Sequence, residues 1–412
     1  MEVLGVNTNR SQFFDMVRNL AMLSVVLFHA VAAYSTVTPH WSVHNGSSII
    51  ADIIREVFDV FMMPIFFFVA GYFALPSLLR KGAWQFLTGK FNRLGIPWLF
   101  AIFAIIPIFQ YLGQMKSAGG QSRQPFLEYW ITYLRGFGTF RIGPLTPESV
   151  NQWHYWFISL LLVFFIAFAL LCSAKKRWGV SNASSSDSGP VRMGSILRAL
   201  FITGVLTSLA YFMVSFFIAD MSWVRIDLLL QFQPTHLVFY IAYFALGIFA
   251  YSRRWFAGDE FPRRLSIWVP VSLLFTLGFL VIGQSIFSNP ETSHRLSAAL
   301  LVPFSLLRSF LCLAFLVAII AIALRFRNGL SAFNRDLAAN SYNIYLVHLV
   351  LVIMFQHTLM VWPGGPPMVK AGFVFLLALL ISYGISRLIK RFPRGFAVFL
   401  LGLFALIAVA TK

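Results

Sequence analysis

Long apolar runs recur from one end of the sequence to the other, and they constrain the fold more than any other feature. A helix needs about 20 apolar residues to cross the hydrocarbon core of a bilayer. A window of about 19 residues finds eleven runs near that length, at 14–34, 57–75, 94–112, 155–172, 200–218, 237–251, 267–286, 300–324, 342–360, 371–388 and 396–410. The pattern predicts an all-α polytopic membrane protein, a bundle of about 10–11 transmembrane helices.

The composition agrees with a membrane protein and excludes an ordinary soluble one. Hydrophobic residues make up 59% of the 412 residues and charged residues 11%, whereas a soluble domain carries about 25% charged residues. Length alone suggests two or three soluble domains, but the apolar runs leave no boundary between them. We therefore interpret residues 1–412 as a single membrane domain, in which residues 180–191 (VSNASSSDSGPV) form a flexible cytoplasmic linker.

The basic residues carry information about orientation. A net charge of +18 suggests nucleic acid as a partner when a chain is soluble, but here the basic residues lie between apolar runs, and such residues concentrate in cytoplasmic connections. Alternate connections, counted from the N-terminus, hold 22 of the 32 Lys and Arg residues. This distribution predicts a cytoplasmic N-terminus, a lipid bilayer as partner and no binding of nucleic acid.

The first apolar run, FFDMVRNLAMLSVVLFHAVAAY, contains Asp15, Arg18 and His29. The spacing from Arg18 to His29 is within about 20° of three full helical turns, so both lie on one face, roughly 16 Å apart along the axis. With the N-terminus inside, Arg18 lies at the cytoplasmic boundary and His29 lies toward the outside. An ionisable residue inside a membrane indicates a functional site by default. Alternatively, Arg18 extends to lipid headgroups and His29 hydrogen-bonds a neighbouring helix.

A basic pair, Lys90 and Arg93 in GKFNRLGIPW, lies at the cytoplasmic start of the third run. Such a pair usually anchors a helix at the inner membrane face. Together with Arg18 it could also bind the phosphate groups of an anionic ligand.

Two further histidines lie in or against apolar runs: His154 at the outer face, and His348 about midway through the ninth run. Each alone is typical of a packed polar side chain, whereas three histidines in the middle or outer half of the membrane favour a polar site. Asp59 is the most plausible carboxylate to orient His29, and its alternative partner is Arg55, four residues earlier on the same helix. We expect no metal site, and serine-hydrolase, P-loop and Rossmann motifs are missing.

These residues and their flanking segments resemble the membrane-bound acyltransferase-3 family. The resemblance rests on six segments in order along the chain: FFDMVRNLAMLSVVLFHAVAAYS with its Arg-x10-His spacing, MPIFFFVAGYF, KFNRLGIPW, WHYWFISLLL, QPTHLVFYIAYFALGIFAYSRRW and SYNIYLVH. The Arg-x10-His spacing alone is weakly specific, but the ordered set extends from the first apolar run to the ninth.

The resemblance implies an acyl-CoA-dependent O-acyltransferase. Such an enzyme takes an acyl group from cytoplasmic acyl-CoA, a co-substrate rather than a permanently bound cofactor, and delivers it to a hydroxyl of an extracytoplasmic glycan such as a periplasmic glucan. The resemblance also implies that His29 is catalytic and that Arg18, Lys90 and Arg93 bind the coenzyme. The family has Arg where this chain has Lys90, and Lys keeps the charge but lacks the bidentate guanidinium geometry.

The other candidate residues have less specific expected roles. His154 and His348 match family positions and are expected to orient His29 or bind the acceptor. Asp59 is assigned to the catalytic group as the carboxylate partner of His29.

Several alternatives stay open at the level of the sequence. The donor is acetyl-CoA or succinyl-CoA, and transfer is either direct or proceeds through an acyl-enzyme at Ser24 or Ser35. A transporter or flippase for a glycan or lipid also fits many helices with a few polar residues inside the membrane. The expected location is the bacterial cytoplasmic (inner) membrane, with multiple passes.

Overall fold

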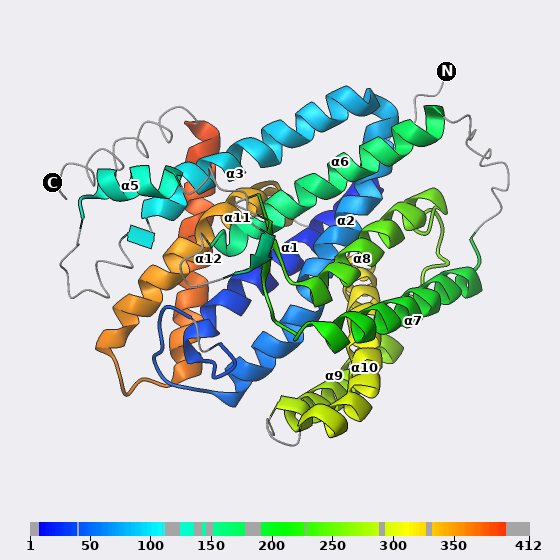
Figure 1. Cartoon of the computed structure of the whole chain (residues 1–412). Coiled ribbons are helices and arrows are strands. Elements are labelled where there is room, and N and C mark those ends of the chain that lie inside the picture. The colour runs from blue at the N-terminus through cyan, green and yellow to red at the C-terminus, as the bar shows by residue number, and fades with distance from the viewer. Residues whose placement is uncertain are drawn as a thin grey trace. The chain divides into compact units, whose positions relative to one another are not determined.

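The structure, a computed structural model, describes residues 8–38, 41–108, 110–111, 124–135, 142–145, 151–177, 191–226, 229–287, 293–326 and 332–392. The chain forms two compact units. The first unit comprises Met1–Leu75, Gly189–Phe217 and Val238–Arg387, and the second unit comprises Pro76–Ser188, Ile218–Leu237 and Leu388–Lys412. Within the described residues both units are predominantly helical (Figure 1).

The first unit is a helical bundle in which α1 packs against α11 and α10 packs against both α7 and α9. Its elements are α1 (Thr8–Ala30), η1 (Ala32–Tyr34), α7 (Met193–Phe217), α9 (Leu265–Phe287), α10 (Ser293–Arg325), α11 (Ala332–Thr358), η7 (Leu359–Val361) and, as far as Arg387, α12 (Pro367–Arg391). It also holds the first part of α2 (Ile49–Lys90) and most of α8 (Pro234–Ser252).

The second unit combines helices with one small sheet. Its helices, besides the end of α2 and the start of α8, are η2 (Phe91–Gly95), α3 (Ile96–Phe100), η3 (Ala101–Ile105), α5 (Phe126–Arg135), η5 (Trp153–Tyr155) and α6 (Trp156–Arg177). The strands β1 (Ile142–Pro144), β2 (Val224–Ile226) and β3 (Leu230–Phe232) pair antiparallel in the order β1-β2-β3. These strands are not predicted by the sequence, because three residues are too few for an alternating pattern to be recognised.

The predicted polytopic membrane architecture is confirmed. Nine stretches of the described residues are long and apolar enough to cross a membrane. One of them, Ile49–Ile108, has 60 residues, about 90 Å as a continuous helix, and therefore contains the starts of both the second and the third predicted span. The eleventh predicted span and residues 180–190 of the predicted linker lie outside the described residues. The cytoplasmic N-terminus and the single-domain interpretation stay predictions.

A backbone irregularity divides α2 between these two spans. Gly82 has φ 74° and ψ 165° in the middle of the helix. This region of backbone space is open to glycine and strained for other residues. The sequence therefore places a glycine where the chain leaves one helical segment and begins the next.

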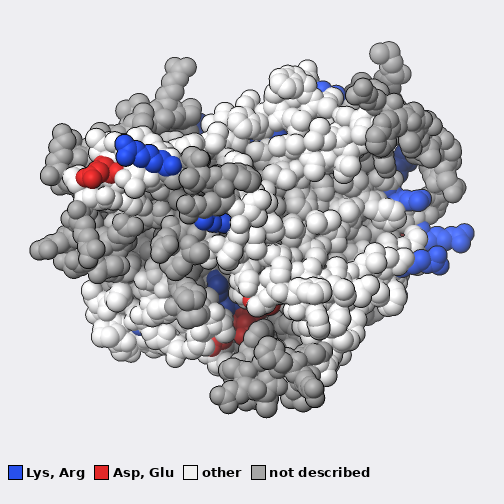
Figure 2. All heavy atoms as spheres, in the orientation of Figure 1, with Lys and Arg blue, Asp and Glu red and all other residues white. Residues whose placement is uncertain are grey.

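Many large apolar side chains are exposed on the described surface, as contact with lipid requires. On α9, Leu273, Leu274 and Leu277 expose 64%, 66% and 62% of their surface. On the face drawn in Figure 2, uncharged residues cover most of the described surface. In water such a surface would drive association, whereas in a bilayer it is the surface expected to face the lipid.

The core of the first unit forms where α1, α11 and α12 meet. Its buried residues follow helical stripes: Met22, Val26 and Ala30 on α1, Leu337, Ile344, Leu351 and Val352 on α11, and Val374 and Ala378 on α12. Spacings of four, seven and eight residues place side chains on one face of a helix. This interface fixes the register between α1 and α11.

Two glycines let α2 and α8 approach closely within the first unit. A Cβ at Gly71 would overlap the carbonyl oxygen of Phe244, and a Cβ at Gly247 would overlap that of Phe68. Small residues allow this close backbone approach between membrane helices. The position of α8 against α2 therefore depends on the absence of two side chains.

Candidate functional site

Two of the predicted site residues, His29 and His348, form a pair in the first unit. Nε2 of His348 lies 3.1 Å from Nδ1 of His29, although the residues are 319 positions apart. Their ring centroids are 5.2 Å apart, with an angle of 44° between the rings. Both residues are candidate site residues from the sequence, and the structure brings them into contact.

The pairing follows from the stripes that pack α1 against α11. His29 is seven residues after Met22, and His348 is four residues after Ile344. Both histidines therefore continue the buried stripes of their helices. They replace apolar side chains at one level of an otherwise apolar interface.

The hydrogen bonds of His348 determine the tautomers of the pair. Nδ1 of His348 lies 2.7 Å from the carbonyl oxygen of Tyr345 and 3.2 Å from that of Ile344. Because a carbonyl only accepts, Nδ1 of His348 carries the proton, and in the neutral ring Nε2 is an acceptor. His29 must then donate from Nδ1, which leaves the lone pair of its own imidazole on Nε2. This is the tautomer that a general base needs.

The burial of the two rings differs in a way that suits separate roles. His348 has no exposed surface, whereas His29 is partly exposed. A fully buried ring can orient its neighbour but cannot meet a substrate. His29 is therefore the member of the pair that is placed to react.

The end of α1 is also held by α2. Nη1 of Arg55 donates to the carbonyl oxygen of Phe28 at 3.2 Å, and its guanidinium carbon lies 3.5 Å from the centroid of the Phe28 ring. Such a cation–π contact is stronger when it is desolvated. Arg55 therefore fixes the residue next to His29.

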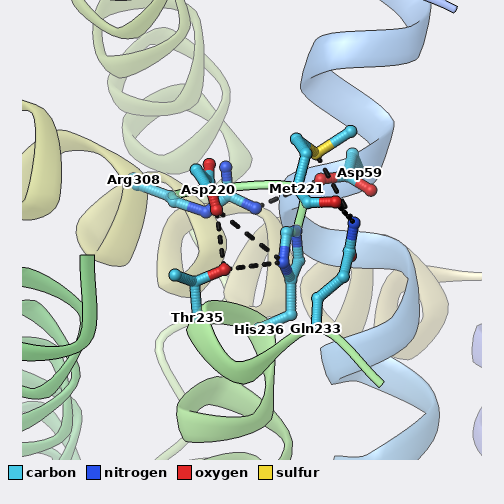
Figure 3. A network of polar contacts seen from close by, with 7 residues as sticks. All are labelled: Asp59, Asp220, Met221, Gln233, Thr235, His236 and Arg308. Carbon is cyan, nitrogen blue, oxygen red and sulfur yellow. Dashed lines mark hydrogen bonds and ion pairs between the residues drawn. The ribbon is translucent and has the colours of Figure 1, made fainter. Parts of the chain in front are cut away.

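Asp59 forms an ion pair with Arg308 of α10 (Figure 3). Nη2 of Arg308 donates to Oδ2 of Asp59 at 3.1 Å, and the guanidinium lies 5.3 Å from the ring centroid of Tyr211. The nitrogen of His29 that an orienting carboxylate would hold contacts His348 instead. The catalytic assignment of Asp59 stays a prediction, and its observed contact is with a buried cation.

The three cations predicted to bind the coenzyme fall in different units. In the first unit, Nη2 of Arg18 lies 2.7 Å from Oδ1 of Asp15, one turn earlier on α1. In the second unit, the ammonium of Lys90 lies 3.9 Å from the ring centroid of Phe165, and Arg93 is exposed. A joint site for Arg18, Lys90 and Arg93 stays a prediction.

His154 lies in the second unit, in a buried polar region at the start of α6. It is buried, and its ring centroid is 4.0 Å from that of Tyr155. Nearby in this region, Oε1 of Gln152 accepts a hydrogen bond from the indole nitrogen of Trp98 at 3.3 Å and another from the hydroxyl of Ser159 at 3.1 Å. The predicted role of His154 toward His29 stays a prediction.

The second unit contains a polar cluster of Asp220, Thr235 and His236 that the sequence did not predict (Figure 3). The hydroxyl of Thr235 donates to Oδ1 of Asp220 at 2.7 Å and lies 3.2 Å from Nδ1 of His236. Since the only hydroxyl proton goes to Asp220, the histidine nitrogen is the donor in the second contact. The segment QPTH is part of the family resemblance, but Asp220, which contacts its threonine, lies in a separate connection that no local spacing identifies.

No group of three or more His, Cys, Asp or Glu side chains that could hold a metal ion occurs among the described residues.

Comparisons with known proteins identify the family of the chain. A family model described as an acyltransferase domain matches residues 11–387. Glucans biosynthesis protein C of Escherichia coli K12 is 28% identical over 159 residues, which are 38% of this chain and 38% of that protein. The protein of the same name in Salmonella paratyphi B is 26% identical over 250 residues, 60% of each chain. The chain thus matches less than two thirds of the length of these relatives, and no solved structure matches it.

Proposed function

The chain belongs to the acyltransferase-3 family and is a multi-pass membrane acyltransferase, and from this premise we propose an O-acyl transfer in which His29 is the general base. The donor is cytoplasmic acyl-CoA, and the acceptor is a hydroxyl of an extracytoplasmic glycan such as a periplasmic glucan. The contact between His29 and His348 carries this proposal, because it leaves a lone pair on Nε2 of a partly exposed imidazole.

The reaction balances with this one base. Nε2 of His29 takes the proton of the acceptor hydroxyl as its oxygen attacks the thioester carbonyl. The carbon–sulfur bond then breaks, and the proton passes from the imidazolium to the leaving thiolate, so that free CoA and an ester are the products. General base catalysis of this kind contributes about 10²–10⁴-fold to a rate.

His348 has a supporting role in the proposed step. Its Nε2 accepts from Nδ1 of His29, which keeps the reacting nitrogen in the unprotonated form. When His29 takes the second proton, the same hydrogen bond is made to a charged ring and becomes stronger. His348 thus occupies the position that an aspartate occupies in a serine-hydrolase triad.

The contacts of the two candidate serine nucleophiles favour direct transfer. The hydroxyl of Ser24 donates to the carbonyl oxygen of Leu20 at 2.9 Å, and the hydroxyl of Ser35 donates to Asp52 at 2.7 Å. A nucleophilic serine needs its proton directed to the base. Neither proton is directed to His29, so we propose that the acceptor oxygen attacks the donor itself.

The donor is expected to approach from the side of the membrane where α1 begins. Arg18 lies roughly 16 Å along the helix axis from His29, a distance that the extended thioester arm of CoA can cover. We propose that Arg18, Lys90 and Arg93 bind the phosphates of the coenzyme, for which the ion pair of Arg18 with Asp15 must open or be shared. The location that this arrangement requires is the bacterial inner membrane, which separates cytoplasmic acyl-CoA from the extracytoplasmic acceptor.

The test is acyl transfer by the purified full-length protein. Labelled acetyl-CoA and succinyl-CoA are offered with a panel of acceptors that includes periplasmic glucans and simple sugars. We expect transfer by the wild type, none by His29→Ala, and wild-type transfer by the control His44→Ala, whose exposed side chain lies in the connection between α1 and α2. Equal transfer by His29→Ala would refute the role of this histidine.

The same preparation tests the rival function. A glycan or lipid transporter would move its substrate across proteoliposomes without any acyl-CoA. If the protein transports such a substrate but neither transfers an acyl group nor binds CoA, the proposed function is refuted and the transporter takes its place.

A further inference from the structure

Two residues outside the histidine pair, Trp41 and Gln356, also hold His29 in the first unit. The indole of Trp41 stacks on the imidazole of His29, with ring centroids 5.8 Å apart and 22° between the rings. Gln356, at the end of α11, donates from Nε2 to the carbonyl oxygen of His29 at 2.9 Å and to that of Ala30 at 3.1 Å. His29 is therefore contacted at one ring face and at its main chain.

Gln356 joins these two contacts. Its Oε1 accepts from the indole nitrogen of Trp41 at 2.8 Å, and its side chain has no exposed surface. The orientation of the amide is unambiguous, because the indole N–H only donates and the main-chain carbonyls only accept. Both amide hydrogens and the amide oxygen of Gln356 are thus used to connect Trp41 with the end of α1.

The connection that carries Trp41 is fastened at both ends. After α1, the hydroxyl of Ser35 and the main-chain nitrogen of Thr36 both donate to Oδ1 of Asp52 at 2.7 Å. Before α2, the buried ammonium of Lys370 donates to the side chain of Asn45 at 2.9 Å and to its carbonyl oxygen at 3.1 Å. Trp41 therefore lies between two fixed points.

From this arrangement we infer that Trp41 and Gln356 are positioning residues for the reaction proposed above: they hold the imidazole of His29 so that Nε2 faces the acceptor hydroxyl. The inference rests on the proposed function. The indole face also attracts the imidazolium that forms when Nε2 takes the proton, since an aromatic face within about 6 Å attracts a cation. All of these contacts are made by the protein's own residues, as preorganised catalysis requires.

The test compares Trp41→Leu, Trp41→Phe and Gln356→Leu with the wild type in the transfer assay. We expect Trp41→Leu and Gln356→Leu to lower kcat about 10-fold or more, with little change in KM for either substrate. Trp41→Phe keeps an aromatic face and is expected to keep more activity than Trp41→Leu. The matched control is Trp84→Leu, because Trp84 is 78% exposed, and we expect it to transfer as the wild type does.

A double variant separates a shared function from two independent ones. Since the two residues act on His29 through one connection, Trp41→Leu with Gln356→Leu should lower kcat by less than the product of the single effects. Independent effects that multiply fully would overturn the shared positioning. A raised KM for the acceptor with unchanged kcat would also overturn it, because the residues would then bind substrate.

A chemical probe keeps this inference testable if the proposed function itself fails. Diethyl pyrocarbonate modifies the unprotonated nitrogen of accessible histidines, and peptide mass spectrometry measures the rate at His29 relative to His44 in the same sample. We expect His29 to react several-fold faster in Trp41→Leu than in the wild type, since the stacked indole covers one ring face. An unchanged rate refutes the positioning, whereas an absence of acyl transfer by the wild type refutes only the proposed reaction.

Discussion

The hydrogen bond between His29 and His348 makes a quantitative prediction about catalysis. His348→Leu removes the acceptor at Nε2 while keeping an apolar side chain in a fully buried position. A hydrogen bond to a group that becomes charged contributes about 1.5–3 kcal/mol, and each 1.36 kcal/mol is ten-fold in rate. We therefore expect kcat to fall about 10- to 150-fold, with KM for donor and acceptor nearly unchanged.

A conservative variant makes the assay specific. In His348→Gln the amide oxygen can accept from Nδ1 of His29 in place of the ring nitrogen, so this variant should recover part of the activity. Initial rates are measured with purified protein at saturating donor and acceptor, and size-exclusion chromatography verifies that each variant stays folded. His44→Gln serves as the control. Wild-type kcat in His348→Leu would refute the tautomer argument, and equal losses in the Leu and Gln variants would show that packing, not the acceptor, is responsible.

Three further predictions concern stability. Arg308→Leu removes the buried cation that donates to Oδ2 of Asp59, and breaking such a pair should destabilise the protein by up to about 3–5 kcal/mol. The double variant with Asp59→Leu should recover most of this loss in thermal unfolding, and wild-type transfer by the double variant would show that Asp59 is not catalytic. Gly71→Ala places a Cβ against the carbonyl oxygen of Phe244 and should lower the Tm sharply, while unchanged unfolding would contradict the close approach of α2 and α8. In the structure the first span ends at Ala30, so Tyr34 lies beyond it. Burial raises the pKa of Tyr34 to about 12, and its hydroxyl lacks a hydrogen-bond partner among the described residues. Because the unfolded chain ionises this tyrosine first, the free energy of unfolding should fall by about 2 kcal/mol between about pH 10 and pH 12, and Tyr34→Phe should remove this loss; the same pH dependence in the variant would assign it to other groups.

The sequence predicted the membrane fold well, because that prediction depends on local chemistry. A run of apolar residues must be helical in a bilayer wherever it occurs, since only a helix or a closed barrel satisfies the backbone there. The kink at Gly82 is different, because glycine occurs in many helices and only the observed backbone shows that this one lies outside helical space. The three strands of the second unit escaped prediction because each is only three residues long.

The site was predicted as a set of residues rather than as an arrangement. His29 and His348 were candidates from the sequence because an ionisable side chain inside a membrane span is costly and usually marks a functional site. It offered Asp59 as the partner of His29, since a carboxylate is the usual orienting group, and it could not foresee the ion pair of Asp59 with Arg308, which lies 249 residues away.

By itself the sequence determined the apolar and helical character of the spans, the family and the residues able to do chemistry. Only the tertiary structure decided that Nδ1 of His29 contacts His348 and that Trp41 and Gln356 hold the same residue. The physical reason is that helix formation depends on neighbours along the chain, whereas a hydrogen bond between α1 and α11 depends on the register of two packed stripes. That register is fixed by the packing of whole apolar faces, and no spacing within either helix encodes it.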